Sequence, residues 1–444
     1  MSRKPASIFA MMVAAALLAA LPAQGGSVGR HRLPNGVTVL TMPGEWNRIV
    51  AISVMVDAGS KHDPPKLPGL ANLTNLMLLQ GTTTRAAPEL AELTDSAGLH
   101  MGVETSRDYA TVYVTAIDSE FDLALEVIAD VLQRPAFDRS RLLEAQRIAQ
   151  ENIEKRLEDP FSAPLTRVAE LIYDDHPYAH DPGGTVKGIE RITAAHLVKF
   201  HTGRYVGGST VISIVGNFPE KLALRRLAEL LSDYPDRQAT PVDFPPVSTE
   251  EAEIARVFKD VDESYIVMGF VAPAAGDPDF TAFEVLDALI GLGSGSRLVA
   301  ALGENGAGLS DVTGALCHCG QEASMFVLYA STEDADGAID VIESEIERLS
   351  AEPVPDEELR TARNRLVGRH VIFGQTNLVR AARLASYELA GLGFDFADSF
   401  LAAVNRVDKD DILRVASEWL RKPATVVVQP GETAPPRGRK RAGI

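Results

Sequence analysis

The strongest constraint on the fold is that one order of predicted elements occurs twice along the chain. Residues 27–235 and residues 251–430 each begin with strands, continue through a helix-rich middle and return to a strand near their end. Between them, residues 236–250 hold prolines in a polar setting, which is typical of a linker. We therefore predict two homologous domains, with boundaries at these residues.

The periodicity of apolar residues indicates the type of each element. Alternation with a period of two marks a half-buried strand, and spacing of three and four residues marks a helix. In the first half it predicts strands at 36–42, 48–60, 108–116 and 209–217 and helices at 68–79, 121–132 and 139–157. In the second half it predicts strands at 264–273, 320–332 and 424–429 and helices at 278–292, 337–349 and 356–370. The expected class is α+β, with each domain an antiparallel or mixed sheet backed by helices.

The two ends of the chain differ in character from the rest. Arg3 and Lys4 precede an apolar run at residues 8–21 and small residues at 22–25, so residues 1–25 are expected to be a signal peptide. An uncleaved membrane anchor is the weaker alternative. Cleavage would give an exported protein with no membrane insertion, periplasmic if the source is a Gram-negative bacterium. Residues 431–444 are rich in proline and basic residues, and we expect a basic disordered tail.

The chain is acidic, with a formal net charge of -18 and a pI near 5.0. This charge disfavours nucleic acid and anionic membranes as partners and favours basic peptides. A role in solubility alone is an equally good explanation of the acidity.

The 444 residues contain two cysteines, Cys317 and Cys319, on either side of His318. The alternation of the surrounding residues predicts a strand, so the two cysteines would share one face and His318 would take the other. Two strand cysteines without a role are the default interpretation, and a metal site is the weaker one.

Several segments together resemble the pitrilysin/insulinase family of zinc metallopeptidases. DAGSKHDPPKLPGLANLTNLMLLQGT is similar to the family's active-site segment, in which a Gly-Ser turn leads to a helix carrying His-x-x-Glu-His. RLPNGVTVL, SRDYATVYVTA, FDLALEVIADVLQRPAFD, HPYAHDPGGTVKGIERITAAHLVKFHTGRY and LIGLGSGSRL resemble further family segments at the expected intervals. The resemblance covers nearly the whole mature chain, and it implies one half of a two-lobed clamshell of the processing-peptidase type.

The resemblance also implies that the zinc motif is degenerate. Two histidines at i and i+4 on a helix bind one Zn²⁺ together, and the glutamate between them acts as general base on the metal-bound water. Here Asn72 and Leu76 stand at the histidine positions and Asn75 at the glutamate position. We therefore expect no catalytic residue, no cofactor in this chain, and zinc only in a partner subunit.

Two further elements of the family can be matched by position. The third zinc ligand would correspond to Glu151, supported by Glu144, although the favoured interpretation of both is that they are solvated helix residues. An Arg and a Tyr seven residues apart grip the substrate in the family, and their positions here fall on Gly303 or Glu304 and on Ser310 or Asp311. The substrate-gripping pair is therefore replaced. His176 and His180 lie in a loop that the family carries without metal.

These observations lead to two hypotheses of function. The first is a non-catalytic subunit that pairs with a zinc-bearing homologue. The heterodimer would form a peptidase chamber for peptide substrates. The second is a stand-alone peptide-binding or scaffolding protein built on the inactive peptidase fold. Hydrolysis of peptides by this chain alone is the least favoured reading.

Overall fold

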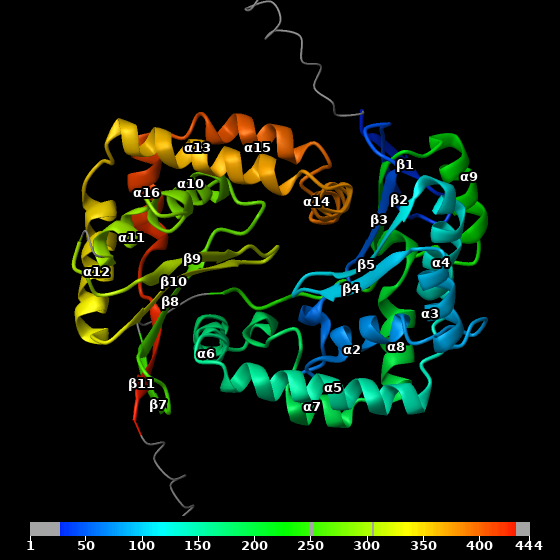
Figure 1. Cartoon of the computed structure of the whole chain (residues 1–444), viewed down its shortest axis with the longest axis horizontal. Helices are drawn as coiled ribbons and strands as arrows, with labels where there is room; N and C mark the ends of the chain where they lie inside the picture. The colour runs from blue at the N-terminus through cyan, green and yellow to red at the C-terminus, as the bar shows by residue number, and fades with distance from the viewer. Residues whose placement is uncertain (1–26, 248–252, 304–305, 432–444) are drawn as a thin grey trace, which may run out of the picture.

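The computed structural model describes residues 27–247, 253–303 and 306–431 (Figure 1). The expected signal peptide and all but the first residue of the expected basic tail lie outside the described residues, as does Glu304.

Each half of the chain is built on one β-sheet. The first sheet has the order β1-β2-β6-β3-β5-β4, and the second has the order β7-β11-β8-β10-β9. The strands of the first sheet are Gly29–Arg32 (β1), Thr38–Pro43 (β2), Ile49–Val56 (β3), His100–Thr105 (β4), Ala110–Ile117 (β5) and Thr210–Gly216 (β6). The strands of the second sheet are Glu253–Lys259 (β7), Ser264–Ala272 (β8), Val312–His318 (β9), Ser324–Thr332 (β10) and Ala424–Pro430 (β11).

The second sheet repeats the first without the outermost strand β1. In both sheets the last strand of the half, β6 or β11, pairs in parallel with the first long strand, β2 or β7. The same strand pairs antiparallel with β3 or β8, and the rest of each sheet is antiparallel. This equivalence confirms the prediction of two α+β domains with mixed sheets.

Helices cover both sheets. Those of the first half are Leu70–Leu78 (α2), Ala87–Ser96 (α3), Phe121–Gln133 (α4), Arg139–Glu158 (α5), Ser162–Tyr173 (α6), Val186–Arg191 (α7), Ala194–Arg204 (α8) and Glu220–Leu230 (α9). Those of the second half are Phe280–Ile290 (α10), Arg297–Leu302 (α11), Ala335–Ala351 (α12), Asp356–Phe373 (α13), Asn377–Leu389 (α14), Phe396–Val404 (α15) and Lys409–Trp419 (α16). Short 3-10 turns occupy Ser60–His62 (η1), Asp118–Glu120 (η2), Pro177–Ala179 (η3) and Gly207–Ser209 (η4). Within the described ranges, these helices lack the length and apolar character needed to cross a membrane.

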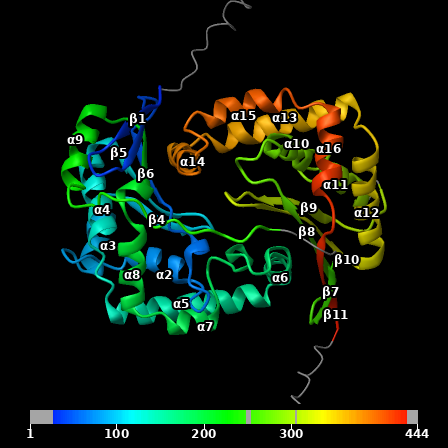
Figure 2. The ribbon, with the colours of Figure 1, turned by 180° about the vertical axis from the view of Figure 1, so that it is seen from behind.

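The two halves exchange one helix each. Helix α6 belongs to the first half but packs against β8 and β11 of the second sheet. Helix α14 belongs to the second half but packs against β3 and β6 of the first sheet. Figures 1 and 2 show both helices at the inner faces of the sheets, between the two lobes. This placement explains why β6 is buried along its whole length, since a strand covered on both faces needs no polar face.

Helix α6 approaches the second sheet closely because β8 carries Gly269 at the contact. A Cβ atom at Gly269 would lie 2.2 Å from Cγ1 of Val168 and 2.8 Å from Cδ1 of Ile172. Val168 and Ile172 are buried in one apolar cluster with Val267 and Val426 of the second sheet. A glycine in the strand therefore makes room for the helix.

Helix α14 approaches the first sheet through small residues of its own. Ala381 is buried with Ala51 and Val215, and Ala385 is buried in a cluster that includes Met55. At the start of α14, the amide of Asn377 donates to the backbone oxygen of Ile49 at 2.7 Å and accepts from the indole of Trp46 at 2.8 Å. The contact is thus fixed by close packing and by buried hydrogen bonds.

A buried polar network also joins the halves. The Asp108 carboxylate of the first half pairs with the Lys61 ammonium at 3.1 Å and accepts from the backbone N–H of Gln321 at 3.1 Å. Lys61 also donates to the side-chain oxygen of Gln321 at 2.7 Å, and the hydroxyl of Tyr178 donates to Asp108. Because Lys61, Asp108 and Tyr178 are buried, this network fixes the turn after β9 against the first half.

The segment between the halves packs against the first half. Residues 239–247 form neither helix nor strand. The ring of Phe244 lies 5.9 Å from that of His62 and 5.7 Å from that of His176, with the Lys61 ammonium 5.8 Å from its centroid. Phe244 therefore anchors this part of the predicted linker to the first half, together with a hydrogen bond from the backbone N–H of Ala239 to the hydroxyl of Ser209 at 3.2 Å.

Overpacking of α14 should destabilise the chain. We predict that Ala385→Leu lowers the free energy of unfolding by about 1–3 kcal/mol, because added methyl groups have no space between α14 and the first sheet. The control is Ala402→Leu, the same change at an exposed position of α15, which should stay within about 0.5 kcal/mol of the wild type. Denaturant unfolding of both variants measures the difference, and equal stabilities would contradict the exchanged-helix packing.

Candidate functional site

Helix α2 carries the three positions that the sequence assigns to the degenerate zinc motif. The carboxylate of Asp63 accepts from the backbone N–H groups of Gly69 at 2.6 Å and Ala71 at 2.7 Å, which fixes where the helix begins. The helix then packs against α5, α8 and β4. The frame that would present a metal site is therefore intact.

The residues at the two histidine positions cannot hold a metal together. Asn72 and Leu76 are one turn apart, lie on the same face of α2, and are both partly exposed. An asparagine oxygen is a weak ligand for Zn²⁺ and a leucine side chain offers none. The face on which the motif would sit is thus present without its ligands.

The residue at the glutamate position has a structural role. The side chain of Asn75 is fully buried, and its amide nitrogen donates to the backbone oxygens of Glu104 at 2.8 Å and Thr111 at 3.2 Å, and to the hydroxyl of Thr105 at 3.1 Å. Asn75 therefore ties α2 to β4 and β5. An amide that donates to these acceptors cannot also serve as a general base, since it takes up no proton at neutral pH.

The two glutamates of α5 lie on the exposed side of that helix. The buried side of α5 consists of Leu142, Gln146, Ala149 and Ile153. Glu144 and Glu151 lie two residues away from these positions, on the opposite side of the helix, and their side chains are 55% and 49% exposed. Both carboxylates pair with Arg147, Glu144 at 2.8 Å. Exposure and pairing with Arg147 agree with solvated helix residues, and the match of Glu151 to the third-ligand position stays a prediction.

The zinc site that the family implies therefore does not fit this chain. Asn72 and Leu76 provide no ligand pair, Asn75 is engaged with two strands, and Glu151 of α5 is paired with Arg147. No catalytic step can be derived through a metal at α2.

The positions matched to the substrate-gripping pair lie around the end of α11. Gly303 follows α11 directly, and the hydroxyl of Ser310 donates to the backbone oxygen of Val312 at 3.0 Å at the start of β9. Asp311 is exposed, and Glu304 lies outside the described residues. Ser310 thus serves the local backbone.

The loop histidines also have structural surroundings. His176 is buried, and its Nδ1 accepts from the backbone N–H of Tyr178 at 3.0 Å, which starts η3. His180 is exposed at the other end of η3. A metal pair at these positions is not formed.

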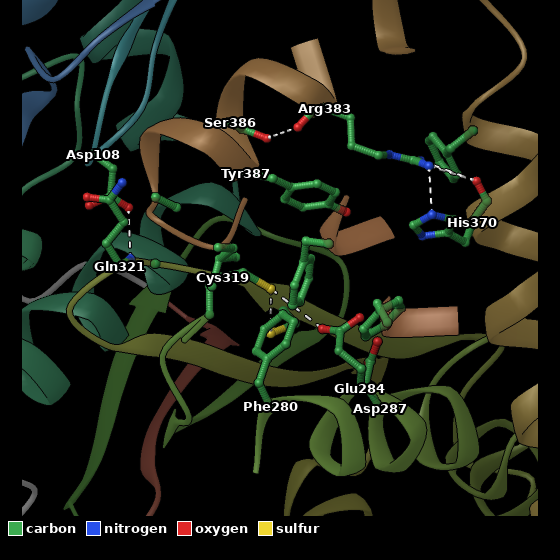
Figure 3. A pocket seen from close by; sticks show the side chains of 18 of the residues that line it. Asp108, Phe280, Glu284, Asp287, Cys319, Gln321, His370, Arg383, Ser386 and Tyr387 are labelled. Carbon is green, nitrogen blue, oxygen red and sulfur yellow. Dashed lines mark hydrogen bonds between the residues drawn. The ribbon is translucent and has the colours of Figure 1, made fainter. Parts of the chain in front are cut away.

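A cavity of about 480 Å³ lies between the two halves (Figure 3). Asp108 and Tyr109 of the first half line it together with residues of α10, α13, α14, α15 and the β9–β10 turn. Apolar rings such as Phe280 and Phe400 form part of the wall, and charged and polar groups form the rest. Concave sites with an apolar wall and a few convergent polar groups are typical binding sites.

Two acidic residues of α10 lie in the wall of this cavity. Glu284 and Asp287 are buried and share the guanidinium of Arg369, at 3.2 Å and 3.3 Å. Burial raises the pKa of Glu284 to about 7 and also raises the pKa of Asp287 above its usual value. One cation thus faces two carboxylates in a poorly solvated place.

Helix α14 contributes an Arg and a Tyr to the cavity. Nη1 of Arg383 lies 2.9 Å from Nε2 of His370, and both terminal nitrogens donate to the backbone oxygen of His370 at 3.2 Å. Burial lowers the pKa of His370 to about 4, so this imidazole is neutral and can accept from Arg383. Tyr387 lies one turn after Arg383 and also lines the cavity (Figure 3).

The two cysteines lie at the same cavity. Sγ of Cys317 is 3.3 Å from Sγ of Cys319, which in turn lies 3.5 Å from Oε1 of Glu284. The prediction that both cysteines share one face is confirmed. The hydrogen bond between the thiols, together with burial, raises the pKa of Cys317 above its usual value.

Two family models match the chain and together cover most of it. Residues 38–179 match the model described as insulinase (peptidase family M16), and residues 191–366 match the model described as peptidase M16 inactive domain. The chain belongs to the M16 family of pitrilysin/insulinase-type peptidases. The boundary between the two matches lies before α8, so the second match begins inside the first half and includes β6 of the first sheet.

Relatives named as zinc proteases match about nine-tenths of the chain. The chain is 24% identical over 408 residues to an uncharacterized zinc protease of Rickettsia bellii, covering 89% of this chain and 96% of the relative. It is 22% identical to the uncharacterized zinc protease YmxG of Bacillus subtilis, covering 92% of this chain and 100% of the relative.

Solved structures show the same fold. The peptidase M16 inactive domain from Pseudomonas fluorescens has a TM-score of 0.84 at 22% identity, covering 92% of this chain and 99% of that one. A protease from Helicobacter pylori has a TM-score of 0.85 at 20% identity, covering 91% of this chain and 100% of that one. The two-sheet architecture is therefore that of M16-type chains.

Removal of the Asn75 amide should destabilise the fold. We predict that Asn75→Ala lowers the free energy of unfolding by about 2 kcal/mol, because it leaves the backbone oxygens of Glu104 and Thr111 without this donor from a fully buried side chain. Asn72→Ala, the same change on the exposed face of α2, should change stability by less than about 0.5 kcal/mol. Thermal and denaturant unfolding compare the two variants, and an equal effect would show that Asn75 has no special structural role.

Proposed function

We propose that this M16 chain is a non-catalytic, exported subunit that forms a peptide-binding chamber with a zinc-bearing homologue. The observation that carries the proposal is the use of Asn75. The helix that would hold the metal keeps its start and its packing, while the position of the general base is committed to β4 and β5. Such a chain is built to fold and to present a surface, without a hydrolytic centre of its own.

Peptides are the ligands that the architecture suits. Strand β4 is the edge of the first sheet and pairs only with β5 among the described strands, and β9 is the corresponding edge of the second sheet and pairs only with β10. An unpaired edge offers backbone donors and acceptors to an extended peptide. Residues adjoining both edges, Asp108 and Cys317, line the cavity, and the net charge of -18 favours basic segments.

A partner surface is provided by three consecutive apolar residues. Val371, Ile372 and Phe373 at the end of α13 are 58%, 62% and 61% exposed, and Phe373 also lines the cavity. Contiguous exposed apolar side chains are characteristic of protein contacts. A partner seated here would cover the cavity mouth, which is where a chamber has to close.

A solitary peptide-binding protein is the second candidate. The observation that favours it is that both halves of one chain already line the cavity, through Asp108 and Tyr109 on one side and α10 and α14 on the other. A binding site of this kind needs no second chain.

The subunit proposal is tested by mixing this chain with the product of a neighbouring gene that encodes an intact His-x-x-Glu-His motif. We expect one complex on size exclusion and a changed peptidase rate of the companion, while this chain alone cleaves no peptide. Ile372→Asp should abolish the complex, because a charge would be buried at the contact. The control is Ile148→Asp, at an exposed isoleucine of α5, which should leave it intact.

The outcome separates the two candidates. A monomer that binds basic peptides and ignores the companion identifies the solitary binding protein. Peptide hydrolysis by the purified chain alone would contradict both.

A further inference from the structure

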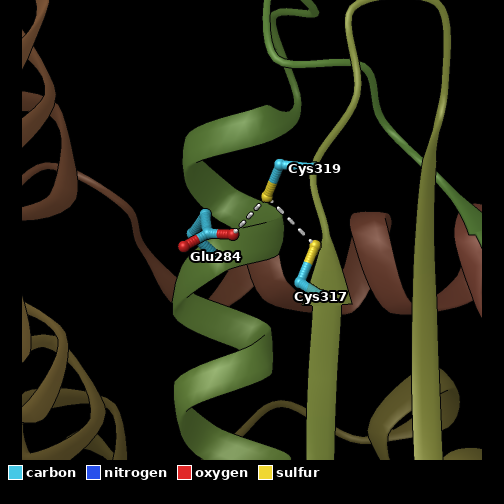
Figure 4. A group of neighbouring side chains, drawn as sticks. All are labelled: Glu284, Cys317 and Cys319. Atoms are coloured by element: carbon cyan, nitrogen blue, oxygen red, sulfur yellow. Dashed lines mark hydrogen bonds between the residues drawn. The ribbon is translucent and has the colours of Figure 1, made fainter. Parts of the chain in front are cut away.

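Cys317, Cys319 and Glu284 converge on one point of the cavity wall (Figure 4). One ligand atom from each of the three side chains lies within 4.8 Å of the other two. The three residues come from two elements, α10 and the end of β9 with its following turn. We propose that they form a binding site for a thiophilic divalent cation, Zn²⁺, with an open coordination position toward the cavity. This site is distinct from the degenerate motif on α2 and does not rest on the proposed function.

The observed separations suit a tetrahedral zinc ion. With Zn–S near 2.3 Å and Zn–O near 2.1 Å, tetrahedral ligands lie about 3.8 Å apart for two sulfurs and about 3.6 Å apart for a sulfur and an oxygen. The two sulfurs are 3.3 Å apart, and Sγ of Cys319 is 3.5 Å from Oε1 of Glu284. The two sulfurs would have to move apart by about half an ångström to reach the separation expected around zinc.

The backbone holds the ligands in this arrangement. A Cβ atom at Gly291, which follows α10, would lie only 2.1 Å from Cβ of Ala315 in β9. The glycine therefore allows α10 and β9 to approach closely, and this approach places Glu284 opposite the cysteines. Ligands on rigid elements need little rearrangement to bind an ion.

The second carboxylate oxygen of Glu284 accepts a hydrogen bond, as a carboxylate that binds a metal commonly does. Oε2 accepts from Arg369 at 3.2 Å, whereas Oε1 points to the sulfurs. A carboxylate ligand oriented by a second hydrogen-bonding group is a common outer-shell arrangement. Arg369 also pairs with Asp287, so two buried carboxylates share one guanidinium and a cation would relieve their repulsion.

Three protein ligands leave the fourth position of a tetrahedral ion open. Cys317, Cys319 and Glu284 all line the cavity, and Cys319 is exposed to it (Figure 3). Sites with three protein ligands and one free position bind water or a ligand of the ion. On binding, each thiol loses its proton to solvent and becomes a thiolate ligand, so the ion is held by two thiolates and a carboxylate.

The test uses the full chain, reduced and freed of metal. Titration with Co²⁺ should give one equivalent bound, with the near-ultraviolet thiolate-to-metal absorption, and Zn²⁺ should displace it. Cys317→Ser and Cys319→Ser should each weaken Zn²⁺ binding more than about 100-fold, which exceeds the effect of losing a residue that only supports a ligand. Each should also reduce that absorption, because one thiolate ligand remains, and the double variant should lack it. Glu284→Gln should weaken binding about 10-fold or more while the thiolate absorption remains.

The matched control is His318→Ala, which removes a potential ligand from the residue between the two cysteines. His318 points to the other face of the strand, so binding should be unchanged. Circular dichroism and unfolding of each variant show whether it is folded. The proposal is overturned if the reduced chain binds no Zn²⁺ at micromolar concentration. It is also overturned if the double variant Cys317→Ser, Cys319→Ser still binds one equivalent, or if the two thiols of the reduced chain reoxidise to a disulfide in the presence of Zn²⁺.

Discussion

The arrangement of the whole chain depends on the exchange of one helix between its halves. Each sheet is covered on one face by helices of its own half and on the other by α6 or α14 from the opposite half. Close contact at Gly269 and Ala385, together with the hydrogen bonds of Gln321 to Asp108 and Lys61, means that apolar contacts and hydrogen bonds would have to break before the lobes could separate. The cavity between the lobes is consequently a built feature of the fold, lined by both halves.

The degenerate zinc motif on α2 contributes to the packing of the first half. In a catalytic helix the residue between the two metal ligands must be free to take a proton. In this chain Asn75 is fully buried and donates to acceptors on β4 and β5, which makes it part of the packing between α2 and the first sheet. The polar chemistry of the chain lies in the other lobe, where Glu284, Asp287 and Arg369 meet two thiols at the cavity wall.

Much of the fold could be predicted from periodicity, and much of the site could not. The alternation at residues 48–60 and 264–273 gave β3 and β8, and the repeated order of elements gave two equivalent sheets, because these are local patterns. Helices α6 and α14 were not predicted, and nothing local in their sequences says that they cover the sheet of the other half. The same limit applies to Glu284, which no spacing connects with Cys317.

The central claim is that this M16 chain has lost the metal site on α2 while keeping the frame around it. Anomalous diffraction at the zinc absorption edge, from crystals of the full chain grown with Zn²⁺, tests it most directly. The account predicts no anomalous peak beside Asn72 and Leu76, whatever other position the ion occupies. A peak within coordination distance of Asn72 on α2 would contradict it.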